Sequence, residues 1–245
     1  MPVRLTFLGS GDAFGSGGRL QACLHLDGGP ESLLLDCGAT AVIALKRAGI
    51  EPASVGYVAL SHLHGDHFAG VPWLILDGQF AKRTNDLVIA GPEGTRDRVR
   101  RTFEALYPGA ADAERDFDTH FLELTEQTPC HLGPASITPF QVQHGGGAVP
   151  YSLRVDYAGK VIAYSGDTEW TDALLEVADG ADLFVCECNF FDRQAPGHLD
   201  YRTLESKRSQ LTCKRMVITH MSAEMLERSR ELGVDAADDG AAIVL

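Results

Sequence analysis

Apolar residues occur in short runs separated by glycine-rich turns, a pattern that predicts alternating strands and helices. The runs predicted to be strands are 3–8, 22–26, 32–36, 55–60, 87–90, 136–142, 152–157, 161–164, 183–188 and 216–219. Apolar residues at every third or fourth position predict helices over 39–48, 68–77, 92–106, 172–178, 201–211 and 222–232. Gly49 and Gly233 are typical helix stops, Ser222 is a typical N-cap, and Pro72 is expected to end or kink its helix.

The predicted elements fall into two similar halves. In each half, a hairpin of two strands is followed by strands that alternate with helices; the hairpin turns lie at 27–30 and 158–160. This order predicts an α/β protein in which two sheets pack face to face with helices on the outside. A length of 245 residues with 44% hydrophobic residues suits one domain, 1–245, with a sizeable core.

The composition narrows the expected partners and location. With 21 basic and 34 acidic residues the net charge is −13, which disfavours a nucleic-acid substrate unless bound cations or a local basic patch reverse the field. The basic run in helix 92–106 is interpreted as a solvated helix face balanced by neighbouring acids. No apolar run approaches membrane-spanning length, and the six cysteines, without a Cys-x-x-Cys, are expected to be mostly buried and reduced. A cytoplasmic location is therefore expected.

A dense cluster of metal-binding side chains follows strand 55–60. It reads His62-Leu63-His64-Gly65-Asp66-His67. A chance match to this pattern has odds on the order of one in a thousand, so a polar loop of solvated histidines is the less favoured interpretation. Imidazole and carboxylate are the usual ligands of zinc and its first-row neighbours. The glycine-rich segment 9–18 lacks a phosphate-binding signature and is expected to bend beside the metal site.

Three further candidates, His144, Asp167 and His220, each stand near the end of a predicted strand. In this order the ligands resemble the metal signature of the metallo-β-lactamase superfamily, over most of the chain. The resemblance implies an αββα sandwich with a dinuclear site of two divalent ions between the sheets, usually Zn²⁺, although Mn²⁺ or Fe²⁺ suits the same ligands. It implies one ion held by His62, His64 and His144, another held by Asp66, His67 and His220, and a bridging Asp167.

Such a pair of cations has a clear chemical use. Two dications a few ångströms apart hold a shared water, lower its pKa to give hydroxide at neutral pH, and stabilise the charge that grows on the attacked centre. Asp167 would offset part of the repulsion between the cations. Asp66 is also a candidate acceptor for the nucleophile's proton.

Within the superfamily, the chain is most similar to the ribonuclease Z and phosphodiesterase branch. The supporting segments are 8–11, 90–94 and 165–168, together with Glu187 after a strand and His198 in Gly197-His198-Leu199. The resemblance implies that His198, oriented by Glu187, stabilises the phosphate or protonates the leaving oxygen. The alternative for His198 is a histidine in a surface loop.

Two departures from ribonuclease Z bear on the substrate. Only 23 positions separate His144 from Asp167, which leaves no room for a long arm that grips transfer RNA, and Gly17-Gly18-Arg19 replaces the expected Arg-Asn loop. We therefore expect a metal-dependent hydrolase of small, cyclic-nucleotide-like phosphodiesters, with transfer RNA less favoured and a homodimer left open. The alternatives are an RNA 3′-processing endonuclease, a lactone, thioester or β-lactam hydrolase, and a metal-binding protein without turnover.

Overall fold

The computed structural model describes residues 2–29, 31–145 and 147–245. Pro30, in the first predicted hairpin turn, lies outside these ranges. The strands of the first sheet are β1 (Arg4–Gly9), β2 (Cys23–Asp27), β3 (Ser32–Leu35), β4 (Val55–Ala59), β5 (Leu87–Gly91), β6 (Thr119–Glu123) and β14 (Ala242–Val244). The strands of the second are β7 (Cys130–Leu132), β8 (Ala135–Gln141), β9 (Tyr151–Tyr157), β10 (Lys160–Tyr164), β11 (Leu183–Glu187), β12 (Met216–Thr219) and β13 (Asp235–Ala236).

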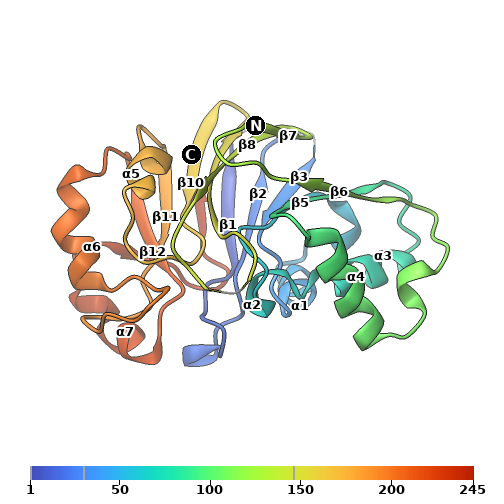
Figure 1. Cartoon of the computed structure of the whole chain (residues 1–245), viewed down its shortest axis with the longest axis horizontal. Coiled ribbons are helices and arrows are strands. Elements are labelled where there is room, and N and C mark those ends of the chain that lie inside the picture. The colour runs from blue at the N-terminus through green and yellow to red at the C-terminus, as the bar shows by residue number, and fades with distance from the viewer. Residues whose placement is uncertain (1, 30, 146) are drawn as a thin grey trace.

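Helices cover the outer face of each sheet, as Figure 1 shows. They are α1 (Ala41–Arg47), α2 (Gly65–Phe68), α3 (Val71–Phe80), α4 (Thr95–Leu106), α5 (Ala173–Ala178), α6 (Tyr201–Lys207) and α7 (Ala223–Arg228). The first four lie beside the first sheet and the last three beside the second (Figure 1). The predicted sandwich of two sheets between helices is confirmed.

The two sheets share one plan that brings several strand ends together. In the described residues, β1, β2 and β3 are antiparallel and β3 to β6 are parallel, while β8, β9 and β10 are antiparallel and β10 to β13 are parallel. Parallel strands end at the same edge of a sheet, so the loops after β4, β10, β11 and β12 can converge.

The core lies between the sheets and under the helices. Leu5, Leu26 and Leu33 of the first sheet pack with Leu153 and Val155 of the second, and all five are almost fully buried. Two further apolar clusters lie where the helices cover the outer faces. Strands covered on both faces are apolar throughout, which explains the continuous apolar runs of β4 and β11.

The helix predicted over 68–77 is confirmed from Val71 onward, but it starts later and runs to Phe80, because the chain breaks between α2 and α3. Gly70 N–H donates to the carbonyl of Cys37 at 2.8 Å. A Cβ at Gly70 would lie 2.1 Å from the carbonyl oxygen of Gly38, so only glycine permits this approach. Pro72 falls in the first turn of α3, where its missing N–H is not needed, and it therefore neither ends nor kinks the helix.

Other predicted boundaries also shift. Helix α4 begins at Thr95 rather than 92, because Gly94 has a left-handed backbone with φ of 84°. Helices α6 and α7 end at Lys207 and Arg228, and each continues as a short 3₁₀ turn instead of an α-helix. Ser222 caps α7 as expected, since its side chain accepts from the Met225 amide.

The hydrophobic pattern of the sequence did not predict the short or polar strands. Strands β6, β7, β13 and β14 were not predicted, because they are brief or mostly exposed. All six cysteines are free thiols and most are buried, as expected; Cys130 and Cys213 are half-buried. None of the helices within the described ranges is long and apolar enough to cross a membrane.

Candidate metal centre

The structure brings the seven predicted ligands together from strand ends in both sheets. His62 and His64 lie in the loop after β4, and Asp66 and His67 lie in the single turn of α2. The others follow strands of the second sheet: His144 lies beyond β8, Asp167 beyond β10 and His220 directly after β12. In the second sheet β10 and β12 both run parallel to β11, so Asp167 and His220 leave the sheet at the same edge.

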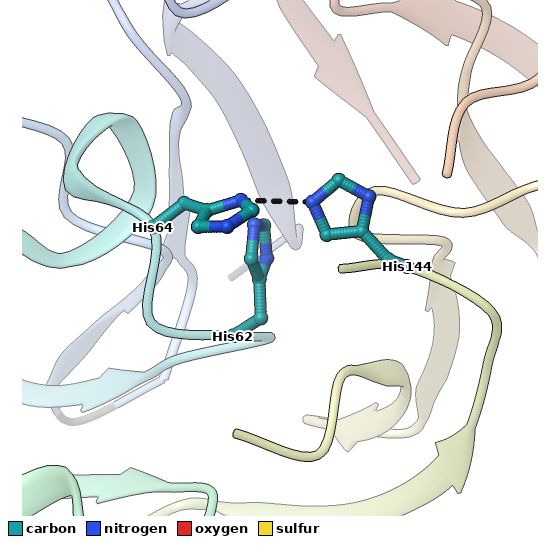
Figure 2. Close-up of side chains that lie close together, drawn as sticks. All are labelled: His62, His64 and His144. Atoms are coloured by element: carbon teal, nitrogen blue, oxygen red, sulfur yellow. Dashed lines mark hydrogen bonds between the residues drawn. The ribbon is translucent and has the colours of Figure 1, made fainter. Parts of the chain in front are cut away.

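One cluster contains His62, His64 and His144. Figure 2 shows the rings of His62 and His64 reaching from one loop toward His144 on another segment. The Nδ1 atom of His64 lies 2.8 Å from Nε2 of His144. The ring centroid of His62 lies 4.9 Å from that of His64 and 4.8 Å from that of His144. Three imidazole nitrogens therefore face one small volume.

A second cluster contains Asp66, His67, Asp167 and His220, all buried. Oδ2 of Asp66 lies 3.2 Å from Nε2 of both His67 and His220. Asp167 places Oδ1 3.3 Å from Nε2 of His67 and Oδ2 3.4 Å from Nε2 of His220. The same Oδ2 lies 3.9 Å from Nε2 of His144, so Asp167 stands between the two clusters.

The polar atoms facing this space fit a metal ion. Nε2 of His62, Nε2 of His67 and Oδ1 of Asp167 are buried and have no hydrogen-bond partner among the described residues. Burying a polar atom without a partner is costly, and cations bound in the two clusters would satisfy all three. The set of imidazole and carboxylate donors suits zinc and neighbouring metals. These buried clusters therefore fit a metal site.

Asp36 supports this site and was not predicted from the sequence. It follows β3 in a left-handed conformation with φ of 57°. Its Oδ2 lies 2.7 Å from Nδ1 of His67, and it accepts from the hydroxyls of Ser61 and Tyr164 at 2.8 and 2.7 Å. A carboxylate on Nδ1 leaves Nε2 of His67 facing the cluster. An Asp directly after an apolar strand was the available signal.

Other histidines are held in the same way through the nitrogen that faces away from the cluster. Nδ1 of His144 donates to the Gly197 carbonyl at 2.6 Å. Nδ1 of His62 lies 3.0 Å from Ser61 Oγ, and Nδ1 of His220 lies 3.1 Å from the Asn189 amide. Partners of this kind set the tautomer and ring orientation of a metal-binding histidine.

The electrostatics favour anionic carboxylates and some neutral imidazoles. Burial lowers the pKa of His62 and of His144, which keeps both in the neutral form that binds metal. Burial also opposes protonation of His67, but the carboxylates of Asp167 and Asp36 outweigh it and raise its pKa. Burial raises the pKa of Asp167, yet the neighbouring His220 and His67 hold it well below its usual range. The anionic carboxylate of Asp167 therefore lies where a cation would bind.

Glu187 and His198 meet beside the clusters. Glu187 ends β11 and is fully buried; its Oε2 lies 3.3 Å from Nδ1 of His198. Nδ1 of His198 is 4.0 Å from Oδ2 of Asp167. Burial raises the pKa of Glu187, and the charge of Asp167 raises it further. The His198 side chain is 26% exposed and lines the same cleft as His64, His144 and His220, so it is not a solvated surface histidine.

That cleft has a volume of about 310 Å³. Segment 9–18 bends beside the clusters as expected, since Asp12, Ala13 and Phe14 line the cleft. The arginines of α4 lie on an exposed helix face, where Arg100 pairs with Asp112. The remaining histidines, His25, His120 and His131, take no part in the two clusters.

The fold and this site define a protein of the metallo-β-lactamase fold. YhfI from Bacillus subtilis, a metallo-β-lactamase fold protein, superposes with a TM-score of 0.80 over 100% of both chains at 24% identity. The short form of human tRNase Z superposes with a TM-score of 0.79 over 98% of each chain at 25% identity. The model of the Anti-Pycsar protein Apyc1 family matches residues 3–236, and the chain belongs to that family.

Curated relatives include ribonuclease Z of Haloferax volcanii, 28% identical over 292 positions that cover 95% of this chain and 90% of the relative. The uncharacterized protein Rv1339 of Mycobacterium tuberculosis is 34% identical over 193 residues, covering 77% of this chain and 68% of the relative. With the buried clusters, these likenesses support a metal-dependent hydrolase of the ribonuclease Z or phosphodiesterase kind.

Proposed function

We propose that the protein is a dinuclear metal-dependent hydrolase of small phosphodiesters, of the size of cyclic nucleotides. The observation that carries the proposal is the position of Asp167 between two ligand clusters, with His198 4.0 Å from it. One ion would be held by His62, His64 and His144, and the other by Asp66, His67 and His220, with Asp167 bridging. Zinc suits this set best, and manganese or iron also suits it.

The residues around the ions then have distinct tasks. Bound dications would supply hydroxide at neutral pH and offset the charge of the phosphate. Asp66 would accept the nucleophile's proton. His198 would donate Nδ1–H to Glu187, and this bond would orient the ring so that Nε2–H of its protonated form gives a proton to the leaving oxygen.

Three features support a small substrate over transfer RNA. The cleft volume of about 310 Å³ is at the low end for small-molecule sites. The hairpin of β9 and β10 fills the interval between His144 and Asp167. The alignment with the archaeal ribonuclease Z spans 292 positions, more than this chain has, so that enzyme carries insertions absent here. An RNA 3′-processing nuclease is the second candidate, because several relatives carry that name.

Hydrolysis of bis(p-nitrophenyl) phosphate tests the proposal. We expect turnover that a chelator abolishes and that added Zn²⁺ or Mn²⁺ restores. Metal-dependent hydrolysis of lactones or thioesters without phosphodiester turnover would contradict it. Full metal occupancy without activity on any ester would favour a binding protein, and efficient cleavage of precursor transfer RNA would favour the nuclease.

The variant His198→Ala separates phosphodiester from carbonyl chemistry. Loss of a proton donor typically lowers the rate by about 10²–10⁴-fold, and we expect this loss with a phosphodiester whose leaving group is an alkoxide, such as a cyclic nucleotide, because an alkoxide needs that proton. The leaving group of an activated carbonyl ester departs without a proton from an acid, so the hydrolysis of such esters should fall much less. His131→Ala, an exposed histidine in β7, is the matched control and should retain both activities. Equal losses on both substrates in His198→Ala would remove the assigned role.

A further inference from the structure

Glu169 is a half-buried carboxylate in the loop that follows β10, two positions after Asp167. Its side chain accepts from the Gly197 amide, with Oε1 at 2.9 Å. Among the described residues, no lysine or arginine lies within ion-pair distance of this carboxylate. The carboxylate therefore bonds to a peptide group of another loop, 28 positions away, and not to a lysine or arginine.

The backbone of Gly197 connects Glu169 to the candidate metal centre. The N–H of Gly197 donates to Glu169, and its carbonyl accepts from Nδ1 of His144 at 2.6 Å. This carbonyl belongs to the peptide that leads directly into His198. Gly197 has φ of 84°, and a Cβ there would lie only 3.0 Å from Nδ1 of His144. One glycine thus holds a candidate metal ligand and precedes the candidate proton donor.

The backbone of Glu169 is itself fixed beside the two clusters. Its N–H donates to the Gln143 carbonyl at 3.0 Å, and the Gln143 amide donates to Thr168 Oγ1 at 3.2 Å. Gln143 immediately precedes His144 in the chain, while Thr168 immediately follows Asp167. The carboxylate of Glu169 therefore projects from a backbone segment that is bonded to the segments of two candidate ligands.

A cavity lies against the loop of residues 194–198, which includes Gly197 and His198. Its volume is about 370 Å³, and Glu169 and Pro196 are among the residues that line it. Side chains therefore do not fill the space on this side of the loop, and the position of the loop there depends on hydrogen bonds. The bond from Gly197 to Glu169 is one of them. Water entering the cavity would bond the same N–H but would not fix where it lies.

We infer that Glu169 is a positioning residue of the candidate metal centre. By fixing the backbone of Gly197, it sets the ring orientation of His144 and the place of His198. Its effect on turnover rests on the proposed function, whereas its effect on His144 needs only the metal site. A partner that orients a metal-binding histidine typically contributes about 10- to 100-fold in metal affinity. Glu169 acts one bond further away, so we expect the lower end of that range.

Three variants test this inference. Glu169→Ala removes the acceptor, whereas Glu169→Gln keeps a side-chain oxygen that accepts from the Gly197 N–H. Glu176→Ala removes an exposed glutamate of α5 and is the matched control. Competition with a chromogenic chelator measures the zinc affinity of each metal-free protein. We expect a loss of about 10-fold in Glu169→Ala, near wild-type affinity in Glu169→Gln and no change in the control.

Turnover of a cyclic nucleotide at saturating zinc measures the effect on His198. The alkoxide leaving group needs a proton, and a misplaced catalytic group costs up to about 100-fold in rate. In Glu169→Ala we expect kcat to fall by about 10- to 100-fold with little change in KM, because Glu169 is not among the described residues that line the metal cleft. Turnover of bis(p-nitrophenyl) phosphate should fall less, since its leaving group departs without that proton.

The outcomes distinguish this inference from the proposed function. Wild-type zinc affinity in Glu169→Ala would overturn the inference. An equal loss in Glu169→Gln or in Glu176→Ala would overturn it too, because the hydrogen bond would not be the cause. A loss that follows only from partial unfolding of the chelated protein, measured in urea, would have the same consequence. If the wild-type protein hydrolyses no phosphodiester, the proposed function falls, while a weaker zinc affinity in Glu169→Ala still supports the positioning of His144.

Discussion

Replacing Asp36 with asparagine probes how the protein orients His67, a histidine of the candidate metal centre. Asparagine keeps the size of the side chain and tolerates the left-handed backbone at this position, φ of 57°. Oδ1 of Asp36 accepts from the Ser61 amide at 2.7 Å. Oδ2 faces the Ser61 hydroxyl, the Tyr164 hydroxyl and Nδ1 of His67. An amide has one acceptor oxygen, so either way it is placed at least one of these donors loses its acceptor.

Two magnitudes follow from this arrangement. A buried donor without a partner costs about 1–3 kcal/mol, and we expect the metal-free Asp36→Asn protein to lose stability by that amount. Removing the outer partner of a metal-binding histidine lowers metal affinity by about 10- to 100-fold, and we expect this loss for zinc. The first effect concerns the fold, and the second concerns the orientation and basicity of His67.

Urea unfolding of the chelated protein measures the stability, and competition with a chromogenic chelator measures the zinc affinity. Tyr164→Phe is the matched control, because it removes one donor to Asp36 but keeps the carboxylate on His67. Its zinc affinity should stay close to that of the wild type. The reasoning is refuted if Asp36→Asn binds zinc as the wild type does, or if Tyr164→Phe loses as much affinity.

Three further predictions concern space, protons and metal removal. Gly38→Ala should destabilise the protein by about 1–3 kcal/mol in urea unfolding, because its Cβ would lie 2.3 Å from the Asp66 carbonyl oxygen. Gly65→Ala is the control and should be tolerated, because the nearest atom to its Cβ lies at 4.0 Å. Equal losses of stability in the two variants would contradict this account. The pKa values of His67 and His220 are raised in the metal-free protein, because the charge of Asp167 outweighs the effect of burial. Protonation of these two histidines therefore stabilises the folded state fully below about pH 6.5, and this stabilisation is lost as the pH rises through the raised pKa values. Zinc must displace those protons, so its affinity should rise in titrations as the pH increases above about 6.5 and through the raised pKa values, and a flat profile would argue against these ligands. Zinc at a hundred times its Kd should stabilise the fold over the chelated protein by about 2.7 kcal/mol for each ion bound, and an unchanged Tm would contradict a site formed by folding.

The sequence identified the side chains that the fold brings together in the two clusters, because strand ends and residue types can both be read along the chain. His62 to His67 follow a continuous apolar run, and parallel strands place the ends of such runs at one edge. Asp36 follows the same rule but was missed, because its role depends on a contact with His67, 31 positions away.

Features that depend on tertiary approach were not predicted. The break between α2 and α3 arises because Gly70 packs against the Gly38 carbonyl, a contact that helical periodicity does not record. Strand β6 carries mostly polar or exposed residues, so its sequence does not predict a strand, although it pairs with β5 along its length. The position of Phe14 in the cleft depends on how Asp12 folds the glycine-rich loop, which the pattern of glycines indicates only as a bend.

The most direct test of the account is a titration of metal-free protein with Zn²⁺, with turnover of bis(p-nitrophenyl) phosphate measured at each addition. The arrangement of two clusters around Asp167 predicts activity that is absent without metal and reaches a plateau at two ions per chain. Activity that is complete without metal, or a plateau at one ion, would contradict the dinuclear centre.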